Sequence, residues 1–188
     1  GEKMKTYKKY LELNDDRFLI RLIDDDDCDS LLEVYSDKMA LPFFNSDNCD
    51  GDNFYYDTKE KMVEALNFWK LAYERGWFVR LSIIDKSIFK AIGTIELCLR
   101  TSDDKFNNCG ILRVDVKSDY ERFDMLYDIF FLIAPMAKEA LGCNSIITKA
   151  PIYAVERIRA LEEVGFVKSN NLMIGKNGIL YYDYWVID

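Results

Sequence analysis

Histidine is absent from this chain of 188 residues. The protein therefore has no Ser-His-Asp or Cys-His catalytic triad, no histidine ligand for a metal ion and no imidazole to act as a general base. This absence excludes more classes of enzyme than any other feature of the composition. If the chain is an enzyme, its proton acceptor must be sought among the carboxylates or in water.

Cysteines are few and scattered. They are Cys28, Cys49, Cys98, Cys109 and Cys143. Their odd number and the lack of a C-x-x-C spacing indicate reduced thiols in a cytoplasm, and not a disulfide framework or a zinc site. Long apolar runs are also lacking, because Asp128 and Lys138 interrupt the segment that best approaches the roughly 18 residues of a membrane-spanning helix. With no visible secretory signal, we expect a cytoplasmic protein that does not contact a membrane.

Basic residues are outnumbered, with 25 Lys and Arg against 33 Asp and Glu and a net charge of −8. This excess of negative charge argues against nucleic acid as a partner and favours cationic ones. The chain is 49% hydrophobic and 31% charged, as in an ordinary globular protein, and it has no internal repeat or linker. We therefore expect a single domain over residues 1–188, with residues 1–15 as a polar lead-in.

Hydrophobic periodicity and turn signals predict that strands and helices alternate. The expected strands are Arg17–Ile23, Phe78–Ile84, Lys90–Leu99, Ile111–Val116, Ser145–Thr148, Leu172–Gly175 and Ile179–Ile187. The expected helices are a short one near Tyr7–Leu13, one that contains Leu31, Leu32 and Tyr35, one between Thr58 and Gly76, Phe123–Leu141 and Ala154–Val164. This order predicts an α/β fold, with a central sheet of mixed strand direction and helices on both faces.

Two acidic segments each permit two interpretations. Asp24–Asp27 precedes a helix, where it would cap the first turn or contribute ligands to a metal ion. Asn45–Asn53 has Gly51 where a calcium-binding EF-hand loop has its glycine, but the terminal glutamate of such a loop is missing, and the other interpretation is a solvated loop. We expect the cap, the solvated loop and no metal site, because consecutive carboxylates cannot all face one ion.

The run Asp119–Leu126 follows an apolar strand and opens a long apolar helix. A strand-to-helix junction exposes backbone N–H groups and the positive end of the helix dipole, which together favour an anion. Here the junction carries acidic side chains in place of glycines. The function depends on what this junction binds.

Several segments resemble the GNAT superfamily of acyl-CoA-dependent N-acetyltransferases, above all the branch that acetylates the N-termini of ribosomal proteins. Arg17–Glu33 (RFLIRLIDDDDCDSLLE) is similar to that branch's R-L-x-L-R-x-L-x-x-x-D-A-x-x-L-x-E. Ile92–Ile95 (IGTI) is similar to its strand I-G-x-I, and Ala160–Phe166 (ALEEVGF) to its helix end L-E-K-x-G-F. The resemblance covers roughly Arg17–Ile187. It implies a GNAT-like, mostly antiparallel sheet in which a central pair of strands, the fourth and fifth, splays apart.

The resemblance also implies acetyl-CoA as cofactor, bound between those two strands. The pantetheine arm would pair with the backbone of the fourth strand, and a loop Q/R-x-x-G-x-G/A would wrap the pyrophosphate. The expected cofactor contacts are Val114, Val116, Arg122, Phe123 and Asp124. The loop motif aligns with Glu121 or with Arg122 at its first position, and neither register supplies a glycine.

Other residues stand where the resemblance implies functional ones. The serine of the family's last helix falls on Arg157, and its general-acid tyrosine falls on Leu161, so that proton donor is missing. The carboxylate of the fourth strand falls on Ile111, and Asp115 lies on the same strand face. Asp115, and Glu96 on the preceding strand, are thus the candidate general bases. Each is otherwise a solvated or arginine-paired carboxylate.

Two hypotheses follow. The first is an acyltransferase that moves an acetyl group from acetyl-CoA to a primary amine by direct attack. Its acceptor would be a small molecule or a peptide, such as a polyamine or a basic N-terminus. The second is a catalytically inactive GNAT-like binding module without normal pyrophosphate binding. In this second case the old groove would hold the aromatic residues Phe123, Tyr127, Phe130 and Phe131. The fold favours the first hypothesis and the loop chemistry favours the second.

Overall fold

The computed structural model of the protein describes residues 12–188. Its strands are β1 (Leu13–Asn14), β2 (Phe18–Leu22), β3 (Val79–Asp85), β4 (Lys90–Leu99), β5 (Gly110–Val116), β6 (Ile146–Lys149), β7 (Val167–Lys168), β8 (Met173–Ile174), β9 (Leu180–Tyr181) and β10 (Tyr184–Ile187). Its helices are α2 (Cys28–Tyr35), α3 (Lys59–Arg75), α4 (Phe123–Leu141) and α5 (Val155–Val164), with the 3-10 turns η1 (Asp25–Asp27), η2 (Leu41–Phe43) and η3 (Ser118–Tyr120). The short helix expected near Tyr7–Leu13 falls mostly outside the described residues, and Leu13 itself belongs to β1.

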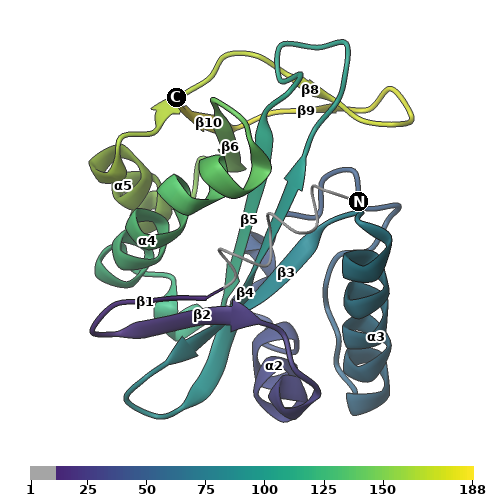
Figure 1. Ribbon diagram of the computed structural model, residues 1–188, viewed down its shortest axis with the longest axis vertical. Helices are drawn as coiled ribbons and strands as arrows, with labels where there is room; N and C mark the ends of the chain where they lie inside the picture. Colours follow the sequence, from purple (N-terminus) through teal and green to yellow (C-terminus); the bar gives the residue numbers. More distant parts are fainter. Residues whose placement is uncertain (1–11) are drawn as a thin grey trace.

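Eight strands form one sheet in the order β1-β2-β3-β4-β5-β6-β10-β7 (Figure 1). Every neighbouring pair is antiparallel except β5 and β6, which run parallel. The strands β8 and β9 form a separate hairpin. This mixed, mostly antiparallel sheet confirms the predicted fold class.

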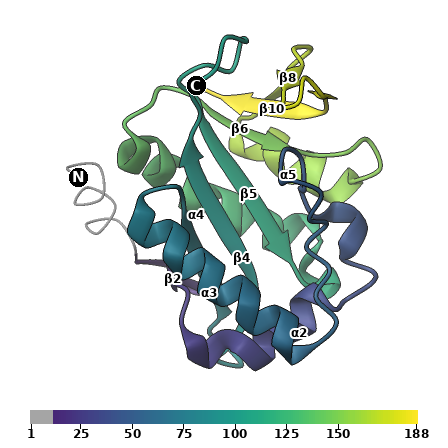
Figure 2. The ribbon, with the colours of Figure 1, turned by 90° about the vertical axis from the view of Figure 1, so that its right-hand side faces the viewer.

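Helices cover both faces of the sheet, as predicted. One face carries α4 and α5, and the other carries α2 and α3 (Figures 1 and 2). The main core lies under α4 and α5, where Leu126, Phe130 and Ile133 are fully buried. A second core lies under α2 and α3, around Tyr35 and Trp69. No helix among residues 12–188 is long and apolar enough to cross a membrane.

The ends of the long helices lie where the sequence predicts them. Thr58 caps α3 by accepting a hydrogen bond from the Lys61 N–H, and Gly76 ends the helix with a φ of 72°. The helix α4 runs from Phe123 to Leu141 and contains Pro135, as predicted. Local capping chemistry therefore fixes both boundaries of α3.

The acidic run before α2 caps a turn, as expected. Asp24 accepts a hydrogen bond from the Asp26 N–H at the start of η1. Asp27 is buried, where it pairs with Arg21 at 2.8 Å and accepts a hydrogen bond from the Ser82 hydroxyl. Within the described part of the chain, no group of three or more acidic or cysteine side chains is arranged to hold a metal ion.

The C-terminal strands differ in part from the prediction. Asn177-Gly178 forms the predicted hairpin turn, with Gly178 at a φ of 75°, and joins β8 to β9. The expected strand Ile179–Ile187 is wrong as a single strand, because Asp183 adopts a left-handed φ of 67° and breaks it. As a result β9 stays with β8, while β10 inserts between β6 and β7. The strands β1 and β7 have two residues each, too few for a periodic signal.

The parallel strands β5 and β6 separate after a short paired stretch. β5 pairs with β4 along its whole length, from Gly110 to Val116. It pairs with β6 only at Gly110↔Ile146 and Ile111↔Ile147. From Leu112 onward its other edge has no strand partner among the described residues. This geometry confirms the predicted splay of the two central strands.

Candidate functional site

The opening between β5 and β6 contains a buried ion pair. Arg157, in the first turn of α5, is 2% exposed, and its Nη1 donates a hydrogen bond of 2.8 Å to the Val114 carbonyl oxygen. Its Nε and Nη2 donate to the two carboxylate oxygens of Glu121, at 2.7 and 2.9 Å. The guanidinium also lies 6.0 Å from the ring centroid of Phe130. This bidentate pair occupies the free edge of β5.

The start of α4 keeps backbone donors free. Arg122 is its N-cap residue, and no side chain caps the first turn, so the first N–H groups have no partner within the helix. The Arg122 side chain is 56% exposed and lies 3.5 Å from Asp124, which also lies 3.6 Å from Arg17. Cations thus balance the acidic side chains at this junction. The helix dipole remains available to an anion.

The other expected cofactor contacts, Val114, Val116 and Phe123, could contact a cofactor mainly through backbone groups. Val114 and Val116 are 1% and 2% exposed, and their side chains pack into the core under α4. The Phe123 ring lies under the Arg159 guanidinium, 4.6 Å from it, and beside the ring of Tyr127. The structure therefore brings the backbone of β5 and the start of α4 to one opening, with these side chains turned into the protein.

The opposite face of β5 carries a buried polar cluster around Asp115, which is 2% exposed. The Tyr35 hydroxyl donates a hydrogen bond of 2.8 Å to Asp115 Oδ2, and Arg80 Nη1 lies 3.6 Å from the same oxygen. Burial raises the pKa of Asp115, although Arg80 acts in the opposite direction. Burial also raises the pKa of Tyr35. Asp115, one of the two predicted bases, is thus held inside the fold by its partners.

Glu96, the other predicted base, lies between two arginines. Its Oε1 accepts a hydrogen bond of 2.9 Å from Arg80 Nη2, and its Oε2 lies 2.8 Å from Arg113 Nε. Arg113 also donates hydrogen bonds to the backbone carbonyl oxygens of Asn45 and Asp47, in the loop before α3. These bonds hold the loop against β5. Burial lowers the pKa of Arg113, but the charge of Glu96 outweighs this and raises it above its ordinary value. Both guanidiniums therefore stay charged beside Glu96.

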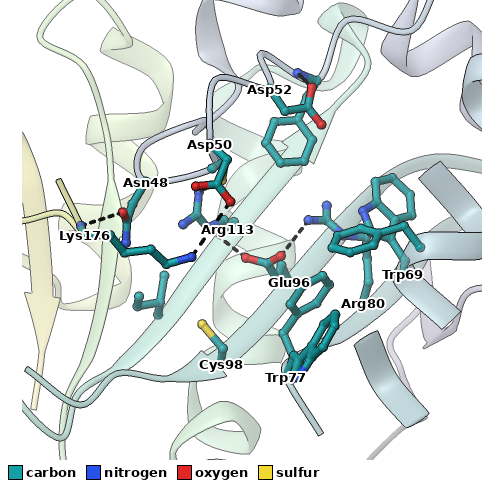
Figure 3. Close-up of a pocket in the computed structure, with 15 residues that line it drawn as sticks. Asn48, Asp50, Asp52, Trp69, Trp77, Arg80, Glu96, Cys98, Arg113 and Lys176 are labelled. Carbon is teal, nitrogen blue, oxygen red and sulfur yellow. Dashed lines mark hydrogen bonds and ion pairs between the residues drawn. The ribbon is translucent and has the colours of Figure 1, made fainter. Parts of the chain in front are cut away.

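A cavity of about 840 Å³ lies over Glu96, on the face of the sheet that α2 and α3 cover (Figure 3). Arg80, Glu96 and Arg113 form its inner end, whereas Asp115 does not line it. Its size is that of a small-molecule site. β5 serves both features, because Ile111 and Arg113 line the cavity and the Val114 carbonyl faces the opening.

Several residues of the cavity are not found by reasoning from the sequence. Trp77 and Phe78 follow the end of α3, and no motif marks them as a wall of a site. Lys176 reaches the cavity from the β8–β9 hairpin, far along the chain. Arg80 does leave a signal, since a charged residue inside an apolar strand is usually paired. Its partner Glu96 is at the matching position of β4.

Comparison with known proteins supports the fold. No protein-family model matches the sequence, and no curated protein matches it. Solved structures do match. An acetyltransferase of the GNAT family from Bacillus anthracis has 13% identity and a TM-score of 0.69, over 94% of this chain and 97% of its own. Ribosomal-protein-S5-alanine acetyltransferase from Vibrio fischeri has 17% identity and a TM-score of 0.68, over 93% of each chain.

A third similar structure contains ligands. Spermidine N-acetyltransferase from Vibrio cholerae, in complex with CoA and spermine, has 11% identity and a TM-score of 0.63, over 92% of this chain and 96% of its own. At such identities the likeness concerns the fold alone. Together with the separation of β5 from β6, it shows that this chain has the fold of the GNAT-family acetyltransferases.

Proposed function

We propose that the protein transfers an acetyl group from acetyl-CoA to a primary amine, by direct attack of the amine on the thioester. The observation that carries this proposal is the free edge of β5. Beyond Ile111 this edge has no strand partner among residues 12–188, and the strand leads to the uncapped start of α4. Free backbone groups beside a helix start suit a ligand with amides and phosphates. One protein with this fold is solved in complex with CoA.

The donor would lie along β5. Backbone groups of Leu112–Val116 would pair with its pantetheine arm, and the N–H groups of Phe123 and Asp124, with the Arg122 side chain, would meet its diphosphate. When bound, acetyl-CoA supplies the acetyl group as an activated thioester. These residues fit such a ligand on one condition. Arg157 must release the Val114 carbonyl, since both would use the same acceptor.

The acceptor would enter the cavity over β4. Glu96 is the carboxylate at the inner end of this cavity, so we assign it the contact with the amine N–H. Asp115 lies behind Arg80 and acts as a positioning residue. The two guanidiniums beside Glu96 disfavour an ammonium ion and favour the neutral amine, the form that attacks a thioester. Glu96 or water then takes the proton, and proximity supplies most of the acceleration.

The net charge of −8 favours an acceptor that is cationic in solution, on a small molecule or a peptide. Such a molecule would be drawn to the protein as an ammonium ion and would lose a proton at the inner end of the cavity. The same charge disfavours nucleic acid as a partner.

One observation favours a second candidate function, a binding module without acyl transfer. If the pair of Arg157 and Glu121 stays in place, the Val114 carbonyl is closed to a cofactor. The module would then differ from the one expected from the sequence. An ion pair closes the opening, while Phe130 is buried in the core and Phe131 is 62% exposed.

Calorimetric titration with acetyl-CoA separates the two candidates. The enzyme is expected to bind acetyl-CoA and to yield an acetylated amine, detected by mass spectrometry. Substitution R122Q should weaken binding, whereas K138Q, in the last turn of the same helix, should not. No heat at high micromolar acetyl-CoA would contradict the acetyltransferase. Tight binding would contradict the module.

A further inference from the structure

The cavity over β4 has two unlike ends, and together they describe a ligand. The inner end holds Glu96 between Arg80 and Arg113. Figure 3 shows Trp77 and the neighbouring aromatic rings on one side of the cavity, with the acidic loop before α3 on another side. A volume of about 840 Å³ holds a small molecule that spans both ends.

Aromatic side chains form the wall next to α3. Phe68 and Trp77 are 50% and 52% exposed, and their ring centroids lie 6.2 Å apart. The Phe78 ring lies 6.0 Å from Phe68, and the buried ring of Trp69 continues the wall inward. Large rings left half exposed beside a cavity favour a flat apolar ligand. Such a ligand removes apolar surface from water and stacks on the rings.

The charges in the cavity favour a ligand with a single amine. The charged lining residues are Arg80, Arg113, Lys176, Glu96, Asp50 and Asp52. Three are cationic and three are anionic, so the lining has no net charge to hold a polycation. At the inner end two guanidiniums flank one carboxylate, and a second ammonium group placed there would be repelled.

Glu96 can still accept a hydrogen bond from a ligand. Each of its carboxylate oxygens has one arginine partner, at 2.9 and 2.8 Å, and a carboxylate oxygen can accept two hydrogen bonds. A neutral amine therefore finds an acceptor at the inner end. A hydrocarbon without an amine would leave that acceptor unused.

We propose that the cavity binds an arylalkyl amine, a primary amine with one aromatic ring, as the acetyl acceptor; this rests on the proposed acetyl transfer. The ring lies against Phe68 and Trp77, and the amine reaches Glu96. In the reaction the amine nitrogen bonds to the thioester carbonyl carbon and the carbon–sulfur bond breaks. The proton that the amine loses passes through Glu96 or water to the sulfur, so CoA leaves as the thiol and no further reactant is needed.

Tryptophan fluorescence tests the ligand class without acetyl-CoA. Two of the three tryptophans, Trp69 and Trp77, line the cavity. Titration with 2-phenylethylamine is expected to change the emission and to saturate. n-Hexylamine lacks the ring, 2-phenylethanol lacks the amine and spermidine carries several amines. At equal ionic strength each should bind at least about tenfold more weakly, a difference of about 1.4 kcal/mol.

Variants locate the site. W77A removes a half-exposed ring, and it should weaken 2-phenylethylamine binding by about tenfold while Trp69 still reports it. F89A is the matched control, because Phe89 is 85% exposed and does not line the cavity. Its affinity should equal that of the wild type. A W77A protein that binds 2-phenylethylamine as tightly as the wild type would overturn the proposal, as would equal or tighter binding of spermidine or n-hexylamine.

A mass-spectrometric assay with acetyl-CoA then distinguishes the two proposals. If 2-phenylethylamine binds but no amine is acetylated, acetyl transfer is wrong, and with it the role of the ligand as acceptor. If aliphatic amines are acetylated and arylalkyl amines are not, acetyl transfer stands and the ligand class is wrong. Preferential acetylation of 2-phenylethylamine supports both.

Discussion

Arg157 donates hydrogen bonds to both carboxylate oxygens of Glu121, at 2.7 and 2.9 Å, where β5 and β6 part. The two side chains are 2% and 6% exposed, so water does little to screen their attraction. The same guanidinium also donates a hydrogen bond to the Val114 carbonyl oxygen, which lies on the free edge of β5. This ion pair and the pantetheine arm of a cofactor would use the same groups. The two therefore compete for the opening.

Removal of the ion pair should strengthen the binding of acetyl-CoA. R157S alone would leave Glu121 buried without its counter-charge, at a cost of about 3–5 kcal/mol in stability. The informative variant is therefore R157S/E121S, which removes one charge of each sign and frees the Val114 carbonyl. We expect its Kd for acetyl-CoA, measured by calorimetry, to be at least about tenfold lower than that of the wild type.

The matched control for this experiment is D57S/K61S. It removes an exposed ion pair of 2.7 Å at the start of α3, away from the opening, and leaves the net charge unchanged. Since surface ion pairs contribute little, its stability and its Kd should stay close to those of the wild type. If R157S/E121S folds, as judged by circular dichroism, and binds acetyl-CoA no more tightly than the wild type, competition by the ion pair is wrong.

Substitution of Glu96 and of Asp115 should have different effects on catalysis. E96Q removes the carboxylate at the inner end of the cavity, so kcat/KM for the amine should fall by about 100-fold. D115N keeps an oxygen that accepts the hydrogen bond of Tyr35 and does not change the cavity lining. Its kcat/KM should stay within about threefold of the wild type. Thermal unfolding of both variants serves as the control for folding, and the opposite order of effects would assign the base to Asp115.

Much of the fold follows from signals that act within a few residues. Thr58 and Gly76 mark the ends of α3, and the turn at Gly178 marks a hairpin, because capping and left-handed turns need particular residue types. The break at Asp183 is different. The break leaves no periodic signal in the sequence, because the apolar run continues on both sides of Asp183, through Tyr182 and Tyr184.

The candidate site is less predictable, because its parts come from distant segments. Glu96 is found from its position on a strand, but its two arginine partners are found only when the register of β3, β4 and β5 is known. Arg157 is recognised from the sequence only as a replaced serine. Its contact with Glu121 depends on the packing of α5 against the start of α4. Tertiary geometry therefore decides what closes the opening.

Asp104 should make the stability of the protein depend on pH in the acidic range. Its side chain is 5% exposed and accepts hydrogen bonds from Arg100 and from the Ile174 N–H, and so joins the loop after β4 to β8. Burial alone would raise the pKa of Asp104, but these hydrogen bonds hold it well below its ordinary value. The stabilisation is therefore complete above the unfolded-state pKa of about 4 and is lost as the pH falls toward the folded-state pKa.

The variant D104N tests this dependence through urea unfolding at several pH values. At pH 7 it should be less stable than the wild type by about 3 kcal/mol, because Arg100 is left without its counter-charge. The difference should shrink as the pH falls below about 4, since the unfolded wild type then takes up a proton that the folded protein resists, and the wild type loses this stabilisation. A difference that does not change with pH would show that the Asp104 carboxylate does not stabilise the fold by its charge.

Gly93 should tolerate no side chain, because the backbone of β5 lies directly against it. A Cβ atom at this position would lie 2.1 Å from the Asp115 carbonyl oxygen and 2.9 Å from the Val116 Cα, and backbone atoms cannot move aside as a flexible side chain can. We expect G93A to lower the free energy of unfolding by more than about 3 kcal/mol, at the upper end of the cost of overpacking.

G142A is the matched control. Gly142 has a φ of 63°, but nothing lies within 4 Å of an added Cβ, so we expect G142A to lower the free energy of unfolding by about 1 kcal/mol. An added Cβ at Gly93 would push against the backbone of β5, which borders both the cavity and the opening. G93A should therefore also weaken acetyl-CoA binding in calorimetry, whereas G142A should not. Equal stability of the two variants would mean that the strands can separate at Gly93 without cost.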